Sequence, residues 1–284
     1  MCIRDRKAAA ELNHRLRGLG IRDQVAAGTF HAVAYAQLKN FWRDKSLPEP
    51  ELLTNKSVFV TKLLPRDYRS IKVLDVVGEI EWAKARRIGP QAYAGMAEEN
   101  GRNIGIPSTQ IGQIYQKYED LKKEQNKVDF DDLLVSCAKA IRSDRSFAAA
   151  QQWRFQHLYV DEFQDVNSVQ VDLLNSWLNG NENLCVVGDP NQAIYGWNGA
   201  DADHLVRFDT HFPGGEIVDL QQNYRSTPQI LRTATSVLED KTFKANRSSG
   251  SNPTITHFSS DKDCLLYTSP SPRDRTRSRM PSSA

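Results

Sequence analysis

Three short segments of the chain place carboxylates, amides, an arginine and aromatic rings directly after apolar runs. They read YVDEFQD (159–165), VGDPNQAIYGWNGA (187–200) and LQQNYRSTP (220–228). Buried strands of a parallel sheet have this pattern, and their functional groups lie at the carboxyl ends of the strands. The pattern therefore predicts functional side chains along one edge of a sheet.

The first segment carries two adjacent carboxylates, Asp161 and Glu162. One carboxylate at a strand end can hold Mg²⁺ through its waters, and its neighbour can activate an attacking water. A charged turn that caps the following helix would contain the same two residues. Only the neighbouring segments favour the chemical interpretation.

The other two segments offer groups that suit phosphates and bases. Gln192 follows a strand, where an amide can sense a γ-phosphate or orient water. Tyr195 and Trp197 lie among glycines, where bases could stack on them, although a turn with two buried aromatics would look the same. Arg225 at a strand-to-helix junction could reach a phosphate, and Tyr224 could stack on an adenine; the alternative for such an arginine is a surface ion pair.

The elements that must position these groups are predicted from periodicity and capping residues. Helices are expected over residues 7–19, 31–41 (with Thr29 as the N-cap), 129–142, 168–178 and 227–238, and strands over 25–28, 157–160, 184–187 and 216–220. Residues 52–127 have a mostly helical pattern with no predicted strand pair. The alternation of helix and strand in the later part predicts an α/β fold with a doubly wound parallel sheet.

Both ends of the chain look foreign to the protein. Back-translation of residues 1–6 and 264–268 gives an inverted repeat that resembles a sequencing-library adapter, so we expect residues 7–263 to be the natural part. A natural Ser/Pro/Arg-rich tail is the alternative. The two ends hold six of the 37 Lys and Arg and two of the 35 Asp and Glu, which leaves a net charge of −2. Net charge therefore gives no argument for nucleic-acid binding.

Composition restricts the class of protein in two further ways. Cys137 and Cys185 are far apart and have no metal-ligand spacing, which is typical of a reduced, cytoplasmic protein. No apolar run approaches the length of a membrane span, so no membrane partner is expected.

Taken together and in this order, the segments resemble motifs II, III and IV of the UvrD/PcrA/Rep-type superfamily 1 DNA helicases. KAAAEL (7–12) resembles the end of motif Ia, GTFHA (28–32) resembles motif Ib, and DFDDLL (129–134) resembles a further DNA-contacting motif. The resemblance implies a P-loop NTPase with RecA-like domains that uses ATP and Mg²⁺. It would move along single-stranded DNA from 3′ to 5′ and act at duplex junctions, in repair or replication.

The resemblance also implies roles for individual residues. Asp161 would bind Mg²⁺, Glu162 would be the catalytic base, and Gln192 would couple the γ-phosphate to DNA. Arg225 would reach the γ-phosphate from a second RecA-like domain, and Tyr224 would pack on the adenine. Contacts with single-stranded DNA are implied for Thr29, Phe30, His31, Phe130, Tyr195 and Trp197. His31 could equally be a satisfied helix-start histidine, and Phe130 could be plain core.

The sequence departs from the family pattern at two points. Asn198 stands where the family often has arginine, which removes a cation from the stacking loop. No G-x-x-x-x-G-K-[ST] phosphate-binding loop occurs in the 284 residues. We expect truncation at both ends to explain this, because the loop would precede residue 7 and motifs V and VI would follow residue 263; a piece without the loop is expected to be inactive.

The expected organisation is a first RecA-like domain over residues 7–44 and 128–212, interrupted by an all-helical insertion over 45–127. Residues 213–263 would begin a second RecA-like domain, and 1–6 and 264–284 would be foreign ends. Three alternatives to a helicase motor stay open. They are a DNA-binding module that does not hydrolyse ATP, the helicase part of a recombination helicase–nuclease, and an unrelated α/β NTPase.

Overall fold

The chain forms two compact units, residues Met1–Glu216 and Ile217–Ala284, in a computed structural model. The structure describes residues 14–16, 18, 20, 25, 27–68, 71–238, 243–254, 256–257 and 259. The predicted helix over 7–19 and strand over 25–28 lie partly outside this set, and the foreign-looking ends lie wholly outside it. None of the helices among the described residues is long and apolar enough to cross a membrane.

A helical layer around Trp177 forms one core of the first unit. Its elements are α2 (Phe30–Asp44), α7 (Phe130–Ser143), α8 (Arg145–Arg154) and α9 (Ser168–Leu178). Helix α7 packs against both α2 and α9, and Leu134, Cys137 and Leu174 are fully buried between them. This confirms the predicted helices over 31–41, 129–142 and 168–178.

These helices begin at side chains that accept hydrogen bonds from the backbone. Thr29 Oγ1 accepts from Ala32 N at the start of α2, as predicted. Asp129 and Asp132 form a reciprocal capping box at the start of α7, and Asn167 and Gln170 form another at α9. An N-cap of this kind stabilises a helix by about 1 kcal/mol, so the sequence fixes where each helix starts.

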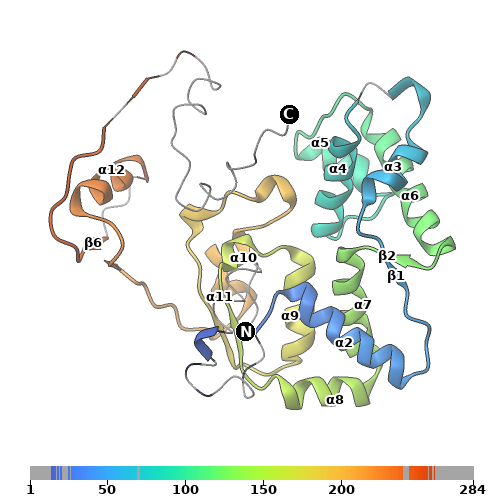
Figure 1. Cartoon of the computed structure of the whole chain (residues 1–284), viewed down its shortest axis with the longest axis horizontal. Coiled ribbons are helices and arrows are strands. Elements are labelled where there is room, and N and C mark those ends of the chain that lie inside the picture. Colours follow the sequence, from blue (N-terminus) through green and yellow to red (C-terminus); the bar gives the residue numbers. More distant parts are fainter. Residues whose placement is uncertain are drawn as a thin grey trace, which may run out of the picture. The chain divides into compact units, whose positions relative to one another are not determined.

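A second core belongs to the helical segment between α2 and α7, shown on its own side of the first unit in Figure 1. Its elements are α3 (Lys56–Leu63), η2 (Arg66–Tyr68), α4 (Val73–Ala85), α5 (Tyr93–Glu99) and α6 (Ser108–Glu124). The expectation of no strand pair here was wrong. Strands β1 (Glu51–Leu52) and β2 (Lys127–Val128) pair in parallel and join the two ends of the segment. Each strand has only two residues, too few for a readable alternation.

A buried charge cluster fixes this segment to α7. Lys84 Nζ lies 2.8 Å from Asp129 Oδ2 and 2.5 Å from Asp132 Oδ1, and Lys122 Nζ lies 3.0 Å and 2.6 Å from Oδ2 of the same two residues. Burial opposes the charge on Asp129, but Lys84, Lys56 and Lys122 hold the pKa of its carboxyl well below the ordinary value. The two ammonium groups occupy the centre of the cluster, so these carboxylates are not available to a metal ion.

Strands β3 (Leu158–Val160) and β4 (Leu184–Val186) pair in parallel, with Val160 opposite Val186. Both strands were predicted, and their carboxyl ends lie side by side. The described residues contain no further strand in this sheet, so the doubly wound sheet stays a prediction. What the structure gives is a mixed α/β architecture. The loops beyond β3 and β4 carry three single turns and two short helices: η3 (Phe163–Asp165), η4 (Pro190–Gln192), η5 (Gly196–Asn198), α10 (Asp203–Val206) and α11 (Phe208–His211).

The second unit contains α12 (Pro228–Leu238) and the parallel pair β5 (Gln222–Asn223) and β6 (Lys244–Ala245). Helix α12 has the predicted bounds, with Pro228 at its first position. The strand predicted over 216–220 was wrong, because this segment is not in a strand and Ile217, Val218 and Leu220 are exposed. Its alternating apolar residues have no partner strand among the described residues to bury them.

Candidate functional site

The two carboxylates predicted to do chemistry lie at the carboxyl end of β3. Asp161 Oδ1 accepts a hydrogen bond from Glu162 N at 3.0 Å, and Glu162 has a left-handed backbone with φ of 53°. Such a conformation is uncommon for a residue other than glycine and tends to occur at functional sites. Within the described part of the chain, neither carboxylate is paired with a lysine or arginine. This contrasts with the lysine-filled cluster on α7.

A chain of hydrogen bonds connects Glu162 with Gln192, which follows the neighbouring strand. Gln164 Nε2 donates to Glu162 Oε2 at 2.7 Å, and Gln164 Oε1 accepts from Asp189 N at 3.0 Å. Asp189 Oδ2 in turn accepts from Gln192 Nε2 at 2.8 Å. Gln164 is almost wholly buried, so its amide is held between the ends of β3 and β4. The structure thus brings two of the predicted catalytic residues into one connected network.

The network depends on a glycine at the end of β4. A Cβ added to Gly188 would lie 2.7 Å from Gln164 Oε1 and 2.8 Å from Leu205 Cδ2. Carbon atoms do not approach this closely, so any side chain at position 188 would displace the Gln164 amide. The glycine is needed here for space and not for a special backbone conformation.

The donor set at the end of β3 fits Mg²⁺. Magnesium prefers oxygen ligands and is usually held by one or two carboxylates together with waters and substrate phosphates. Asp161 and Glu162 supply such oxygens, partly exposed and without a competing cation from the described residues. Asp161 is the residue that would hold the ion. Glu162, oriented by Gln164, has the carboxylate that could take a proton from water.

The aromatic loop after Gln192 rests on helix α4. Tyr195 and Trp197 have ring centroids 6.5 Å apart, and Trp197 is 67% exposed, which leaves a face available for stacking. Gly199, with φ of 86°, lies against Ala85 so closely that a Cβ would come within 2.5 Å of the Ala85 methyl. The loop then pairs back to the start of α9 through the bridge between Asn167 and Ala200.

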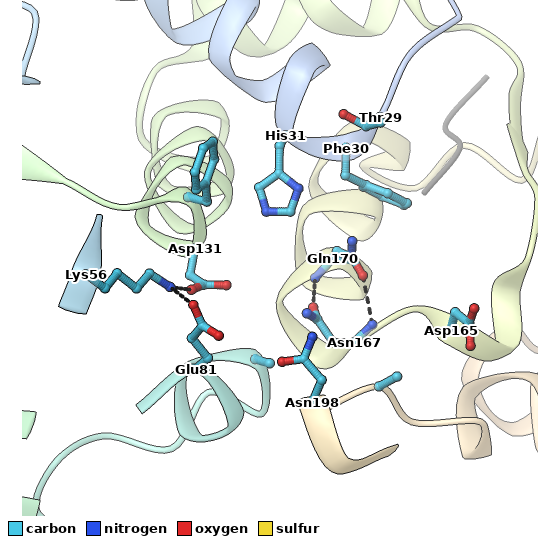
Figure 2. Close-up of a pocket in the computed structure, with 13 residues that line it drawn as sticks. Thr29, Phe30, His31, Lys56, Glu81, Asp131, Asp165, Asn167, Gln170 and Asn198 are labelled. Carbon is cyan, nitrogen blue, oxygen red and sulfur yellow. Dashed lines mark hydrogen bonds and ion pairs between the residues drawn. The ribbon is translucent and has the colours of Figure 1, made fainter. Parts of the chain in front are cut away.

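A pocket of about 310 Å³ lies where α2, α7 and α9 begin, facing α4 and the aromatic loop (Figure 2). Four of the predicted DNA-binding residues line it: Thr29, Phe30, His31 and Phe130. The rings of His31 and Phe130 meet edge to face, with centroids 6.0 Å apart. The capping side chains Thr29 and Asn167, which line the pocket, make the wall polar beside these rings.

The opposite side of the pocket is polar and acidic. Lys56 Nζ lies 2.9 Å from Glu81 Oε1 and 3.0 Å from Asp131 Oδ2. Burial lowers the pKa of Lys56, but the carboxylates of Asp131, Asp129 and Glu81 outweigh it and raise that pKa above the ordinary value. Asn198, in the position where arginine was expected, also lines the pocket.

The remaining predicted residues have different surroundings. Phe30 lines the pocket but stacks on Trp177 at 5.7 Å and is only 2% exposed, so one face of its ring belongs to the core. Tyr195 and Trp197 do not line the pocket; their neighbour Asn198 does. Tyr224 and Arg225 lie in the second unit, directly after β5, and both are exposed. The roles inferred for all these residues stay predictions.

Several residues of the site were not singled out from the sequence. Gln164 and Gly188 lie inside recognised segments, yet only the structure reveals that they touch. The pair Asn167 and Gln170 has the spacing of a capping box, which is readable from sequence. Its position in the pocket is not readable, since it depends on how α9 packs beside α2.

The family model and the related proteins that match this chain all belong to one family of helicases. A family model described as the UvrD/REP helicase N-terminal domain matches residues 5–213. The chain is 38% identical over 247 residues to the ATP-dependent DNA helicase UvrD2 of Mycobacterium tuberculosis (strain ATCC 25618 / H37Rv), covering 82% of this chain and 35% of that protein. It is 32% identical over 241 residues to DNA helicase II of Escherichia coli (strain K12), covering 82% and 33%.

A third relative, the ATP-dependent DNA helicase PcrA of Bacillus subtilis (strain 168), is 29% identical over 245 residues, covering 82% of this chain and 32% of that protein. The chain thus spans about a third of the length of the curated relatives it matches. The family model covers the carboxylate pair, the aromatic loop and the pocket. The chain therefore belongs to the UvrD/REP helicase family.

Proposed function

We propose that these residues are part of the motor of an ATP-dependent DNA helicase that moves along single-stranded DNA from 3′ to 5′ and opens duplex junctions. The observation that carries this proposal is the hydrogen-bonded path from Glu162 through Gln164 and Asp189 to Gln192. It joins a carboxylate suited to activating water with the loop that presents Tyr195 and Trp197. A change around the γ-phosphate would therefore be passed to groups that touch bases.

The proposal assigns a task to each side chain of this path. Asp161 would hold Mg²⁺, which neutralises charge on the ATP phosphates when it is bound. Glu162 would accept the proton of the attacking water, and Gln164 would orient the Glu162 carboxylate. Gln192 would contact the γ-phosphate, and Arg225 and Tyr224 would reach the nucleotide from the second unit.

The proposal also includes a division of the chain into domains. Residues 7–44 and 128–212 would form a first RecA-like domain with a doubly wound sheet, 45–127 a helical insertion, and 213–263 the start of a second RecA-like domain. Single-stranded DNA would pass the starts of α2 and α7, along Thr29, His31 and Phe130, and over Trp197. Base stacking on such aromatic rings is tolerant of sequence, as a translocating motor requires.

The test is ATP hydrolysis by the full-length gene product with and without single-stranded DNA. Glu162→Gln keeps the shape of the side chain but cannot take a proton. We expect turnover to fall by about 10²–10⁴-fold, the usual contribution of a general base, while a fluorescent ATP analogue still binds.

Glu182→Gln is the matched control, because Glu182 is exposed in the turn before β4; its turnover should equal that of the unmodified protein. Unwinding should require a 3′ single-stranded tail on the duplex. Full turnover by Glu162→Gln, or unwinding that needs a 5′ tail, would contradict the proposal.

A second candidate is a module that binds single-stranded DNA without hydrolysis. It is favoured by the exposed Trp197 and by the aromatic rings of the pocket, on which bases could stack whether or not ATP is hydrolysed. If the full-length gene product binds single-stranded DNA but hydrolyses no ATP, this candidate replaces the motor.

A further inference from the structure

The second unit brings a further arginine, Arg247, next to Arg225. Strands β5 and β6 are parallel, with Asn223 opposite Ala245. Arg225 and Arg247 each lie two residues beyond these positions. Because the carboxyl ends of parallel strands meet at the same edge of a sheet, this register brings the two arginines to the same level. Arg247 Nη1 there donates a hydrogen bond to the backbone carbonyl oxygen of Arg225 at 3.0 Å.

The backbone of Arg225 is held from both sides. Its N–H donates to Asn223 Oδ1 at 3.0 Å, and its carbonyl oxygen accepts the hydrogen bond from Arg247. Asn223 Oδ1 also accepts from Ser226 N at 2.8 Å, so two donors fix this side chain. The two soft backbone dihedrals of a residue lie between its N–H and its C=O. Fixing both groups therefore sets the direction in which the Arg225 side chain leaves the backbone.

Arg247 is itself anchored by the residues on either side of it. Asn246 N donates to Asn223 O at 2.8 Å, which extends the pairing of β6 with β5. On the other side, Gly250 N donates to Gln229 Oε1 at 3.0 Å, on helix α12. The segment that carries Arg247 is therefore tied both to the strand pair and to the helix that follows Arg225.

The guanidinium group of Arg225 is available to a ligand. Among the residues that the structure describes, neither Arg225 nor Arg247 is paired with an aspartate or a glutamate, and both arginines are exposed. The surface ion pair considered for Arg225 from the sequence is thus not found in this part of the chain. An unpaired guanidinium on a fixed backbone suits a phosphate, because its fork of N–H donors matches phosphate oxygens.

We propose that Arg247 is a positioning residue for Arg225, which it orients toward the γ-phosphate of ATP by holding the Arg225 carbonyl. The inference rests on the proposed function, which assigns Arg225 to the γ-phosphate. Arg247 acts through Arg225 and not through a phosphate contact of its own. A misplaced Arg225 would stabilise the transition state less, because that stabilisation depends on donors that are already in position when charge develops.

The test is the steady-state kinetics of ATP hydrolysis by the full-length gene product with single-stranded DNA. Arg247→Met keeps the aliphatic stem and removes the donor. We expect kcat to fall by about 5-fold, the scale of one orienting hydrogen bond, at an unchanged KM for ATP. Arg247→Lys restores a cationic donor and should recover most of the loss. Arg232→Met removes an exposed arginine from α12; it is the matched control and should leave both parameters unchanged.

A double-mutant cycle decides whether Arg247 acts through Arg225. Arg225→Met alone should lower kcat by about 10³-fold or more, as the loss of an arginine at a transferring phosphate does. Adding Arg247→Met to this variant should cause no further fall, because no guanidinium is left to orient. A further fall of the size seen in Arg247→Met alone, or a rise in KM at unchanged kcat in that variant, would show that Arg247 acts independently and would overturn the inference.

The remaining outcomes separate this inference from the proposed function. If Arg225→Met hydrolyses ATP at the unmodified rate, the task proposed for Arg225 is wrong and the inference falls with it. If Arg225→Met is impaired while Arg247→Met equals Arg232→Met, the inference alone is overturned. Equal impairment of Arg247→Met and Arg247→Lys would also overturn it, since a donor to the carbonyl oxygen would then make no difference.

Discussion

Single residues at the ends of β3 and β4 connect the proposed water-activating group, Glu162, to the aromatic loop. The amide nitrogen of Gln164 donates a hydrogen bond to Glu162, and its amide oxygen accepts one from the backbone N–H of Asp189. Gly188 leaves the space that this amide occupies. Neither residue is expected to touch substrate, so both are positioning residues for the proposed chemistry.

Gly188→Ala tests this arrangement, because the added methyl would overlap Gln164 Oε1 and Leu205. We expect the free energy of unfolding of the 284-residue chain to fall by about 1–3 kcal/mol, as overpacking usually costs, measured by urea denaturation. Gly78→Ala is the matched control within α4, where a Cβ meets nothing within 4 Å. It should raise stability by up to about 1 kcal/mol, since alanine favours helix over glycine. Equal stability of Gly188→Ala and the unmodified chain would show that the space is not restricted.

At the scale of elements, the helical segment of the first unit is held on α7 by charge as well as by apolar packing. Lys84 comes from α4, Lys122 from α6, and their partners Asp129 and Asp132 from the start of α7. Tyr118 donates a further hydrogen bond to Asp129 at 2.9 Å. Helix α4 thus meets α6 and α7, which follow it in sequence, at one carboxylate that is 0% exposed.

Lys84→Met should be strongly destabilising, because it removes a cation from a buried carboxylate that keeps its charge. Breaking one side of a buried ion pair costs about 3–5 kcal/mol. The measurement is urea denaturation of the 284-residue chain near neutral pH. Lys139→Met on the exposed face of α7 is the control and should change stability by less than about 0.5 kcal/mol. A similar small effect for both variants would mean that the cluster is relaxed by water or by proton uptake.

Helices that begin at a recognisable capping residue or proline could be predicted from the sequence. Short strands without such a residue could not. Thr29, Asp129 and Pro228 are helix-start signals, and α2, α7 and α12 begin beside them. Strands β1 and β2 have two residues each and depend on a partner far along the chain, so no local pattern reveals them. The segment 216–220 shows the reverse case, where β-favouring residues have no described partner and form no strand.

The same limit applies to the site. Residue types identified the carboxylates, Gln192 and the aromatic loop, because these groups have recognisable chemistry. The hydrogen bonds of Gln164 and the amides of the pocket depend on packing between segments, which sequence spacing does not contain. The roles of the residues themselves still await the experiments above.

At the scale of the whole molecule, the two units differ in how much apolar surface they bury. The first unit has two cores, whereas helix α12 of the second has no buried residue, and Val237 is 78% exposed. A helix of this length is marginal in water unless packing supports it. Helix α12 therefore has little local stability of its own in this chain.

Amide hydrogen exchange should reveal this difference directly. We expect the amides of α12 to exchange with little protection, while those of α7 and α9 are protected up to the global free energy of unfolding. The comparison is internal, because all three helices are measured in one sample. Protection of α12 equal to that of α9 would show that the second unit has a core of its own.

The contact between Gly199 and Ala85 limits how this chain can change over evolutionary time. A hydrogen is the largest substituent that the present spacing of loop and helix allows at 199, because a Cβ there would lie 2.5 Å from the Ala85 methyl. Any side chain at 199 requires the aromatic loop to move away from α4. Substitution at 199 is therefore coupled to the residue at 85, and a variant with a side chain at 199 would keep this loop in place only if the methyl group at 85 were removed as well.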